Sequence, residues 1–255
     1  MLMVCKDAGG SVQFQASIED LMIRFFHESF KSGRVYVVSP WVTAFNLSIN
    51  LIHMPYVDNN NVVDVLRALV NRGVEVRVLT RCVDDSLDVQ FMRVLINLYR
   101  SGGLKLPDEV RGLFRRDIED FINRAESLVR LASDLGDNLR FDLGDEDDLF
   151  AMYRLHSKLY INDYSVIMGS ANFTRGGVLD GGNWECVIRF ARGENEELYR
   201  YALNVAEHYF SISRGFGDCE RRVVRIVNAV VGSLDVPIYG IEDLIDYLGR
   251  VRESL

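Results

Sequence analysis

The sequence lacks a long apolar run, an N-terminal signal peptide and an excess of positive charge. No stretch of about 18 apolar residues occurs in the chain, so we expect no membrane-spanning helix. The first residues, MLMVCKDAGGSVQF, do not combine a charged start with an apolar core, which favours a cytoplasmic protein. The formal net charge of −8 argues against a protein that coats nucleic acid through bulk positive charge, although local basic clusters can still bind phosphates.

Cysteine is scarce, and linker segments are absent. The four cysteines are scattered without the paired spacing of a zinc site, which favours reduced thiols over disulfide bonds or bound zinc. They are Cys5, Cys82, Cys186 and Cys219. No stretch rich in proline, glycine or serine divides the chain. With 48% hydrophobic residues, its 255 residues suffice for one large core.

The first third of the chain alternates helical and strand patterns. Apolar residues recur at helical spacing in residues 17–32 and 61–72. Each of these segments precedes a short apolar strand, at residues 34–38 and 74–80. Strand, helix and strand in this order form a βαβ unit with neighbouring parallel strands. We therefore expect an α/β fold, with a mixed, largely parallel sheet flanked by helices on both faces.

Two further helical regions extend this domain. Residues 84–136 form a helical insertion in which Pro107 opens the longer helix, and residues 216–255 form a helical C-terminal tail after a main domain at 1–215. We favour an insertion that lies near the active site and restricts the substrate; a dimer contact or padding of the core is the alternative. Acidic residues alternate with the arginines of the insertion, which favours a solvated face over a phosphate-binding one. These arginines are Arg111, Arg115, Arg116 and Arg124.

The chemistry concentrates in the stretch HSKLYINDYSVIMGSAN, residues 156–172. Residues 153–161 and 165–168 read as strands around an Asn-Asp turn. Side chains two apart on a strand share a face, so His156 and Lys158 should point the same way. Ser170 and Asn172 have the same spacing. The hairpin therefore gathers an imidazole, a fixed cation and two neutral hydrogen-bonding groups.

This set of side chains suits a phosphate ester. Lys158 supplies a compact positive charge for non-bridging oxygens, and Ser170 and Asn172 can donate hydrogen bonds to the developing negative charge. His156 can attack phosphorus or move a proton. The set requires no metal and no other cofactor. The best candidate for a divalent metal is the acidic run at residues 145–148, but it lacks the spacing of a calcium loop, which favours an exposed acidic loop.

The pattern His156-x-Lys158-x4-Asp163, followed by Gly169-Ser170-x-Asn172, resembles the signature of the phospholipase D superfamily. Members of that superfamily include lipid phosphodiesterases, phosphatidyl transferases and metal-independent nucleases. The segment Asn183-Trp184-Glu185 resembles the family's Asn-x-Glu segment, in which the acidic residue supports the catalytic histidine. The family's opening strand runs into a Ser-Pro-aromatic corner near the site, which places Trp41 at the pocket; a core tryptophan is the alternative.

The resemblance implies roles for individual residues. Asp163 lies past the turn and is expected to organise the hairpin rather than touch substrate. Glu185 is expected to orient the histidine and to stabilise its cationic form. The implied catalytic set is His156, Lys158, Asp163 and Glu185, and the implied substrate-binding set is Lys158, Ser170, Asn172 and Trp41.

The motif occurs once, whereas the resembled enzymes use two copies per active site. None of the other three histidines, His27, His53 and His208, has a lysine two residues later. We therefore expect a homodimer that shares one active site at its two-fold axis. A second protein that supplies the other half-site remains an alternative.

The resemblance implies a metal-independent phosphodiesterase that forms a phosphohistidine intermediate. A nuclease acting on DNA or RNA is the first expectation, because a single-motif chain without a membrane-facing segment resembles the family's dimeric nucleases more than its lipid enzymes. A phospholipase D-type lipid phosphodiesterase or phosphatidyl transferase is the second. A catalytically silent nucleic-acid-binding protein is the third.

Overall fold

The computed structural model describes most of the chain. The described residues are 1–6, 17–48, 57, 60–86, 107–144, 153–179, 183–231 and 237–254. Residues 87–106 of the expected insertion and the acidic run at 145–148 lie outside these ranges. No helix among the described residues is long and apolar enough to cross a membrane.

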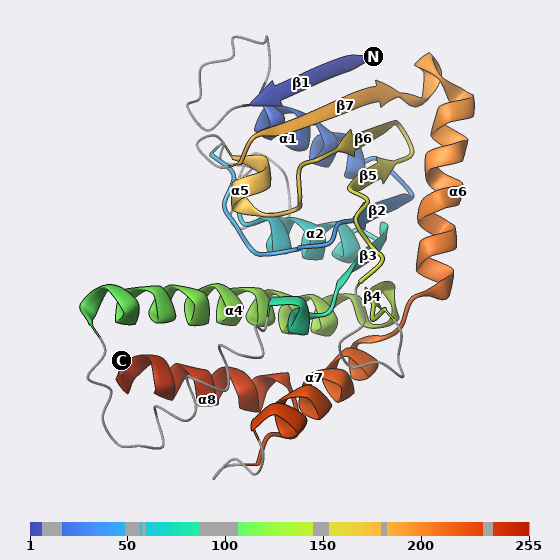
Figure 1. The fold of residues 1–255 in the computed structure, drawn as a ribbon. Coiled ribbons are helices and arrows are strands. Elements are labelled where there is room, and N and C mark those ends of the chain that lie inside the picture. The colour runs from blue at the N-terminus through green and yellow to red at the C-terminus, as the bar shows by residue number, and fades with distance from the viewer. Residues whose placement is uncertain are drawn as a thin grey trace.

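The described strands form one sheet of seven, in the order β1 (Leu2–Lys6), β7 (Glu185–Ala191), β6 (Ser165–Gly169), β5 (Leu159–Asn162), β2 (Arg34–Val38), β3 (Glu75–Arg81) and β4 (Leu139–Asp142). Strands β2, β3 and β4 run parallel, and every other neighbouring pair is antiparallel (Figure 1). The mixed α/β class is confirmed. The expectation of a largely parallel sheet is wrong, because β5 pairs antiparallel with β2 and β6, and β7 pairs antiparallel with β6 and β1.

The parallel half of the sheet follows the expected βαβ pattern. Helix α1 (Ile18–Ser29) begins with a capping box, in which the Ser17 hydroxyl accepts from the Asp20 amide and the Asp20 carboxylate accepts from the Ser17 amide. Helix α2 (Val62–Asn71) connects β2 to β3 and ends before Gly73, whose φ of 80° suits glycine. Both helices bury their apolar side against the sheet.

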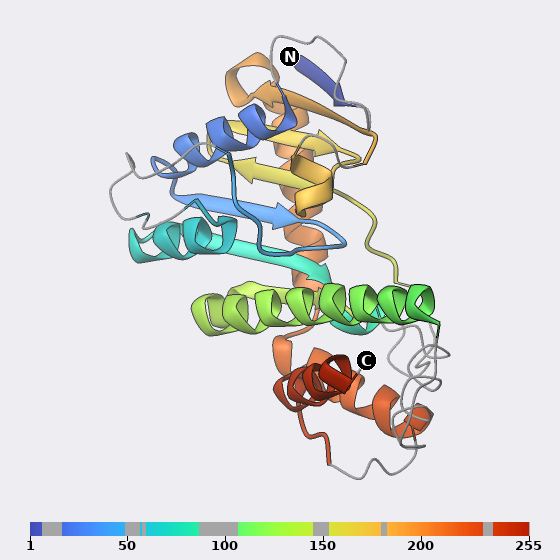
Figure 2. The same cartoon turned by 90° about the vertical axis from the view of Figure 1, so that its left-hand side faces the viewer.

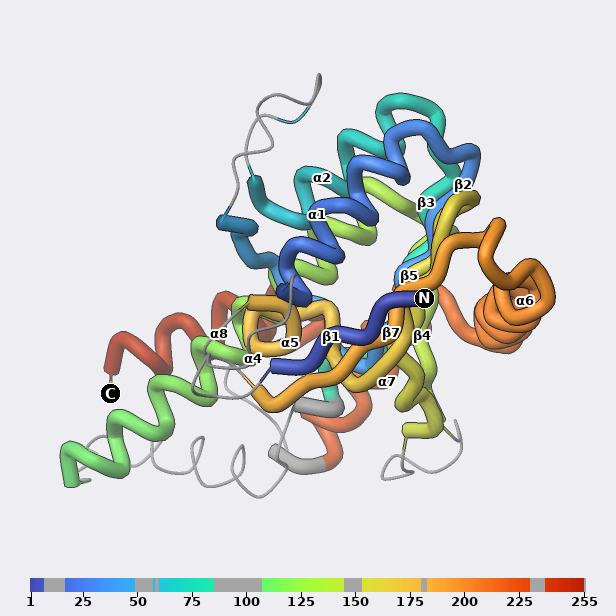
Figure 3. The backbone as a smooth tube through the Cα atoms, turned by 90° about the horizontal axis from the view of Figure 1, so that it is seen from above, coloured from blue at the N-terminus to red at the C-terminus, as the bar shows by residue number. Residues whose placement is uncertain are grey.

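Helices cover the two faces of the sheet unequally. Helices α1 and α2 and the long helix α4 (Asp108–Leu135) share one large core with one face of the sheet, and α6 (Glu196–Ile212) packs alone on the other face in a smaller core (Figure 3). Flanking helices on both faces are thus confirmed. The short helix α5 (Arg175–Val178) lies between β6 and β7.

The C-terminal helices extend the large core away from the sheet. Helices α7 (Phe216–Val231) and α8 (Ile241–Ser254) lie beyond α4 in Figure 2, and α8 packs along α4. Their buried side chains belong to the same core as those of α1 and α2. The division into a domain at 1–215 and an extension at 216–255 stays a prediction from the sequence.

The cysteines correct the sequence-based expectation of reduced thiols. Cys5 is bonded to Cys186 and Cys82 to Cys219, so that no cysteine remains free. The first disulfide joins β1 to β7, and the second joins the end of β3 to α7. The partners lie 181 and 137 residues apart in the sequence, and spacing along the chain does not reveal pairing over such distances.

The helical insertion corrects the expectation of a fully solvated arginine face. Arg124 on α4 is only 4% exposed. Its guanidinium donates to the carbonyl oxygens of Pro40, Arg81 and Cys82, at 3.4, 3.2 and 3.2 Å. These carbonyls follow the ends of β2 and β3, so Arg124 fastens α4 across the carboxyl ends of the parallel strands. Arg115 and Arg116 are exposed, as expected.

Candidate active site

His156 and Lys158 lie side by side at the end of the sheet where β2 ends and β5 begins. The Lys158 Nζ atom is 3.2 Å from His156 Nδ1 and donates to the His156 carbonyl oxygen at 2.8 Å. This contact confirms that the two side chains share a face. The expected strand is shorter, because β5 starts at Leu159 and both residues precede it. His156 is exposed, whereas Lys158 is buried.

The polypeptide around His156 is held by β3 and β4. The Asp142 carboxylate, at the end of β4, accepts hydrogen bonds from the backbone amides of Arg154 and Leu155 at 2.7 and 2.5 Å. Arg81, at the end of β3, donates to the Leu155 carbonyl oxygen at 2.7 Å. Position at the carboxyl end of a parallel strand was the only sequence signal for these two residues.

A second tie to this segment comes from the C-terminal helices. The Arg222 guanidinium lies 5.6 Å from the centre of the Tyr153 ring and donates to the Asp84 carboxylate at 2.8 Å. Arg222 and Asp84 are both buried. Arg222 belongs to α7, which the Cys82–Cys219 disulfide joins to β3. Nothing in the local sequence predicts this contact.

The side chains of Ser170 and Glu185 are joined by a hydrogen bond next to the end of β6. The Ser170 hydroxyl donates to the Glu185 carboxylate and accepts from the Cys186 amide at 2.9 Å. Its own amide donates to the Cys186 carbonyl oxygen at 2.9 Å. Ser170 thus orients Glu185, which is 6% exposed, and its hydroxyl is engaged within the protein rather than held ready for a substrate.

The close approach between β6 and β7 requires glycine before Ser170. A Cβ atom on Gly169 would lie 2.1 Å from the Cys186 carbonyl oxygen. Gly177 on α5 has the same requirement, because its Cβ atom would lie 2.2 Å from the Asn172 carbonyl oxygen. These two glycines allow β7 and α5 to press against the segment that carries Ser170 and Asn172.

Asn172 lies in a segment whose backbone is held on both sides by hydrogen bonds. Its Oδ1 atom is buried and accepts no hydrogen bond within the described part of the chain. The segment is fixed on both sides of it, because the Tyr160 hydroxyl donates to the Ala171 carbonyl oxygen at 2.6 Å and the Phe173 amide donates to the Ser39 hydroxyl at 3.0 Å. A buried amide oxygen without a partner is costly, so this atom calls for a donor from a bound molecule or a water.

The two sides of the site interact electrostatically through Lys158. Burial lowers the pKa of Lys158 below the ordinary lysine value of 10.5, and the positive charge of Arg81 acts in the same direction. The Glu185 carboxylate opposes them and raises the pKa of Lys158. No hydrogen bond joins Glu185 to His156 among the residues described in one chain, so the expected orienting role of Glu185 stays a prediction.

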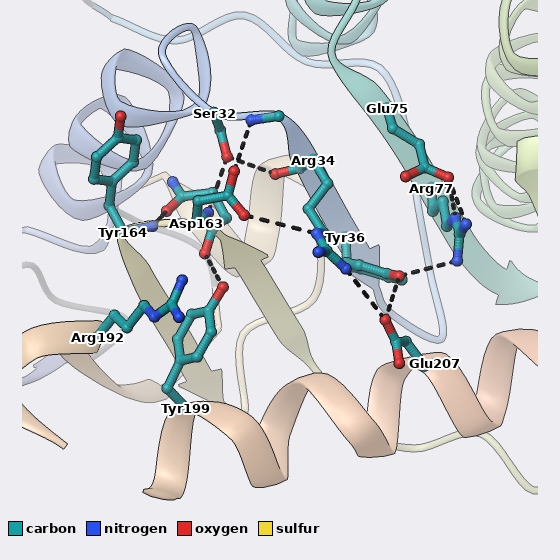
Figure 4. A network of polar contacts seen from close by, with 12 residues as sticks. Ser32, Arg34, Tyr36, Glu75, Arg77, Asp163, Tyr164, Arg192, Tyr199 and Glu207 are labelled. Atoms are coloured by element: carbon teal, nitrogen blue, oxygen red, sulfur yellow. Dashed lines mark hydrogen bonds and ion pairs between the residues drawn. The ribbon is translucent and has the colours of Figure 1, made fainter. Parts of the chain in front are cut away.

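Asp163 lies away from the other motif residues, at the far end of β5. Its carboxylate accepts from the Gly33 amide at 2.7 Å and pairs with Arg34 at 3.7 Å, and its amide donates to the Ser32 hydroxyl at 2.9 Å (Figure 4). These contacts join the β5–β6 turn to the loop between α1 and β2. They fit the expected organising role, and they place Asp163 outside the candidate active site.

Trp41 lines a cavity of about 1180 Å³ between α4 and the loops that follow β2 and β6. Its side chain is 44% exposed, which excludes the alternative of a core tryptophan. Thr174, Gly176 and Asn183 line the cavity from the connection between β6 and β7, while His156, Lys158, Ser170, Asn172 and Glu185 are not among its lining residues. Helix α4 forms the opposite wall with Asp117, Asp120, Phe121 and Glu126.

The described residues contain no cluster of three or more histidine, cysteine, aspartate or glutamate side chains that could hold a metal ion. The acidic run at 145–148 is outside that search. The expectation of metal-independent chemistry therefore stays a prediction. The described side chains themselves offer an exposed imidazole, a buried cation and a buried hydrogen-bonded carboxylate at one sheet edge, which is a set suited to attack at phosphorus.

The sequence model of the family described as "Cardiolipin synthase, PLD-like domain" matches residues 48–205. The match covers more than half of the chain and includes all the motif residues. The chain therefore belongs to this phospholipase D-like family. A search of curated proteins found no match.

Two solved structures are similar to the chain. NucT from Helicobacter pylori has 11% sequence identity and a TM-score of 0.49, with 84% of this chain and 98% of that chain covered. Nuc from Salmonella typhimurium, a phospholipase D family member, has 14% identity and a TM-score of 0.42, with 78% and 91% covered.

Proposed function

We propose that the protein is a metal-independent phosphodiesterase with His156 as its nucleophile. The observation that carries this proposal is the contact of 3.2 Å between His156 Nδ1 and Lys158 Nζ, beside the bonded pair of Ser170 and Glu185. A nucleophile and a fixed cation in contact, in a chain of the phospholipase D-like family, match the needs of phosphoryl transfer.

The contact between the two side chains defines how the attack begins. While the Lys158 ammonium donates to Nδ1, a neutral His156 carries its proton on Nε2 and has no free lone pair there. When Lys158 turns to the non-bridging oxygens of a phosphate, Nδ1 can carry the ring proton and Nε2 keeps its lone pair. The Nε2–P bond then forms as the bond from phosphorus to the leaving oxygen breaks. The Asn172 Nδ2 group would donate to the phosphoryl oxygens.

A second histidine completes this cycle. The leaving oxygen needs a proton, and water must later be activated to hydrolyse the phosphohistidine. The chain carries one motif, so the partner's His156 in a symmetric homodimer would supply both steps.

Subunit mixing tests the shared site. Wild type and His156→Ala would be unfolded under oxidising conditions and refolded together at equal concentrations. If each site needs both histidines, activity falls to about a quarter of that of the unmixed wild type, because only wild-type pairs remain active. Independent sites would retain about half. A monomer in sedimentation at micromolar concentration would contradict the dimer and favour a catalytically silent binding protein.

The substrate class divides into two candidates. A nuclease is the first, because a single-motif chain with a shared site suits a symmetric, extended phosphodiester such as DNA or RNA. The cavity gives specific support to the second, a lipid phosphodiesterase or phosphatidyl transferase. Its α4 wall combines Phe121 with the acidic Asp117, Asp120 and Glu126 and the basic Arg124 and Arg130, and such a wall can accept an apolar chain with a charged head group.

The first test is hydrolysis of bis(p-nitrophenyl) phosphate in EDTA. We expect activity that survives EDTA and falls at least about 10³-fold in His156→Ala. The matched control is His208→Ala, which removes an exposed histidine on α6 and should change nothing. Full activity in His156→Ala would refute the assignment, and activity lost in EDTA would redirect attention to residues 145–148.

The second test separates the substrates. The same two variants would be assayed with single- and double-stranded DNA, RNA and phospholipid vesicles. Cleavage of a nucleic acid that depends on His156 supports the nuclease, and release of a lipid head group supports the second candidate. Binding of nucleic acid without turnover of any substrate would favour the silent protein.

A further inference from the structure

Strand β1 is an edge strand that ends directly against the candidate active site. It pairs only with β7 in the described sheet, and its last residue pair is Lys6 with Glu185. Side chains of directly paired residues lie on the same face of a sheet, and both of these side chains are buried. The N-terminal strand therefore borders the carboxylate that Ser170 orients.

The preceding pair of residues carries a covalent link. Cys5 and Cys186 are directly opposite each other and form a disulfide. Backbone groups of Cys186 make two hydrogen bonds with Ser170, at 2.9 Å each. The disulfide thus holds β1 onto the residue that positions Ser170, and through it Glu185.

Lys6 connects β1 to Asn172 as well. Its ammonium donates to the carbonyl oxygens of Gly176, at 2.9 Å, and Leu179, at the end of α5. Helix α5 in turn presses on Asn172, where Gly177 allows the close approach. The Lys6 side chain is 9% exposed, so these bonds lie largely out of water, where an ammonium needs its partners.

The two disulfides differ in their access to solvent. Cys82 and Cys219 are each 0% exposed within the large core. Cys186 is exposed and Cys5 is partly exposed. A dithiol in solution can therefore reach the disulfide of β1, whereas the core disulfide is shielded unless the protein opens.

We propose that β1 is a positioning element of the active site and that thiol–disulfide exchange at Cys5–Cys186 controls its attachment. With the disulfide formed, β1 holds α5 and β7 so that Asn172 and Glu185 keep their positions in the site. With the disulfide reduced, the edge strand is held only by weak bonds and separates from β7 more often, and turnover falls. This inference rests on the proposed phosphodiesterase function.

A dithiol reductant supplies the two electrons that reduce the Cys5–Cys186 disulfide. A thiolate of the reductant attacks the exposed Cys186 sulfur, the S–S bond breaks, and Cys5 leaves as a thiolate that takes up a proton. The second thiol of the reductant attacks the mixed disulfide, releases Cys186 and gives up its own proton. Two electrons pass to the protein, and the reductant becomes a disulfide.

Turnover of bis(p-nitrophenyl) phosphate in EDTA tests the proposal, with the full chain assayed before and after treatment with dithiothreitol. Alkylation and mass spectrometry would identify the thiols formed. We expect alkylation at Cys5 and Cys186 but not at Cys82 and Cys219. The kcat should fall about 10- to 100-fold with little change in KM, and reoxidation should restore it.

Two outcomes would overturn the proposal. The first is unchanged kcat once Cys5 and Cys186 are alkylated. The second is a native protein whose Cys5–Cys186 disulfide resists the dithiol while Cys82–Cys219 is reduced. A Cys5→Ala/Cys186→Ala variant provides the matched control, because its activity should equal that of the reduced wild type and should not respond to dithiothreitol.

Hydrogen exchange gives a readout that does not need turnover. The Ser170 amide, bonded to the Cys186 carbonyl oxygen, should exchange faster after reduction, while amides of the central pair β2 and β3 should not. An oxidised protein without activity would refute the proposed function, and this measurement would still decide the inference. Unchanged exchange at Ser170 would overturn it.

Lys6 supplies an independent variant. Lys6→Met removes the bonds to α5 while leaving the disulfide in place, and kcat should fall in the oxidised protein. Lys6→Arg keeps a cation that can donate to two carbonyl oxygens and should restore most of the activity. Equal losses in both variants, or no loss in either, would show that β1 does not position the site through Lys6.

Discussion

The two sides of the candidate active site are fastened in different ways. His156 and Lys158 follow a segment tied by Asp142, Arg81 and Tyr153 to the carboxyl ends of β3 and β4 and to α7. Ser170 and Glu185 belong to β6 and β7, which β1 holds at the edge of the sheet. Each side includes one disulfide; that of the His156 side is buried in the core, and that of the Glu185 side is accessible.

The two sides of the site therefore differ in how rigidly the fold holds them. A nucleophile needs a fixed direction of attack, and buried polar bonds to several elements provide it. Ser170 and Glu185, the residues proposed to support the nucleophile, lie beside an edge strand, and an edge strand opens at a lower free energy than the centre of a sheet. We therefore expect substitutions on the His156 side to lower mainly the free energy of unfolding, and substitutions on the Glu185 side to lower mainly kcat.

The largest expected effect comes from removing the buried ion pair between Arg222 and Asp84 on the His156 side. Arg222→Met leaves the Asp84 carboxylate buried without its ion-pair partner, which is 2.8 Å away in the native protein. The free energy of unfolding, measured in denaturant with both disulfides intact, should fall by about 3–5 kcal/mol. Turnover at temperatures where the variant is folded should also fall, because Tyr153 loses its neighbour.

The adjacent Arg221 provides the matched control for this variant. It pairs with Asp218 on the surface and its side chain is 72% exposed. Arg221→Met should change the unfolding free energy by less than about 1 kcal/mol. Similar losses in the two variants would show that the burial of Arg222 does not fasten the His156 side.

An intermediate effect is expected from the Glu185 side. Ser170→Ala removes the hydroxyl that donates to the Glu185 carboxylate, and kcat should fall about 10- to 100-fold, in line with the value of a hydrogen bond to a charged group. The control is Ser165→Ala at the other end of β6, whose hydroxyl donates to Glu28 at 2.6 Å. It should cost stability without a matching loss of kcat. Equal effects on kcat would remove the distinction between the two sides.

The smallest expected effect concerns the electrostatic interaction between Glu185 on one side of the site and Lys158 on the other. Lys158 must be cationic to bind phosphoryl oxygens, so activity should fall at alkaline pH as Lys158 loses its proton, below the ordinary lysine value of 10.5. The Glu185 carboxylate raises the pKa of Lys158, so Glu185→Gln should lower that pKa further and move the alkaline limb to lower pH. The pH profile of kcat/KM measures this shift. Glu207→Gln on α6 should leave the limb in place; a limb that moves upward in Glu185→Gln would contradict the coupling.

Local patterns in the sequence predicted the parts of the fold that local physics determines. Helix α2 between two parallel strands, the opening of α4 after Pro107 and the β5–β6 hairpin all follow from periodicity and from turn and capping chemistry. The spacing of His156, Lys158, Ser170 and Asn172 predicted that they meet at one sheet edge, because β5 and β6 pair as a hairpin.

The remaining parts depend on contacts between residues far apart in the sequence. Strand β1 is a five-residue edge strand whose position is set by pairing with β7, and its sequence alone gives no such signal. The same holds for Arg222, which meets Asp84 at a separation of 138 residues. Asp163 combines the two cases, since its place after the turn predicted an organising role, while its partner Gly33 lies 130 residues earlier in the chain.

The two disulfides also determine the covalent connectivity of the chain. Their loops interleave, because Cys82 lies between Cys5 and Cys186, and Cys219 lies beyond both. A single backbone cut anywhere between Cys5 and Cys219 therefore leaves both fragments joined in one molecule. Loops of 181 and 137 residues also restrict the unfolded chain, each by about 5 kcal/mol in the loop-closure description. A chain nicked between Cys82 and Cys186 accordingly stays covalently joined until a reductant has opened both bridges, whereas a cut on either side of that stretch is bridged by one disulfide.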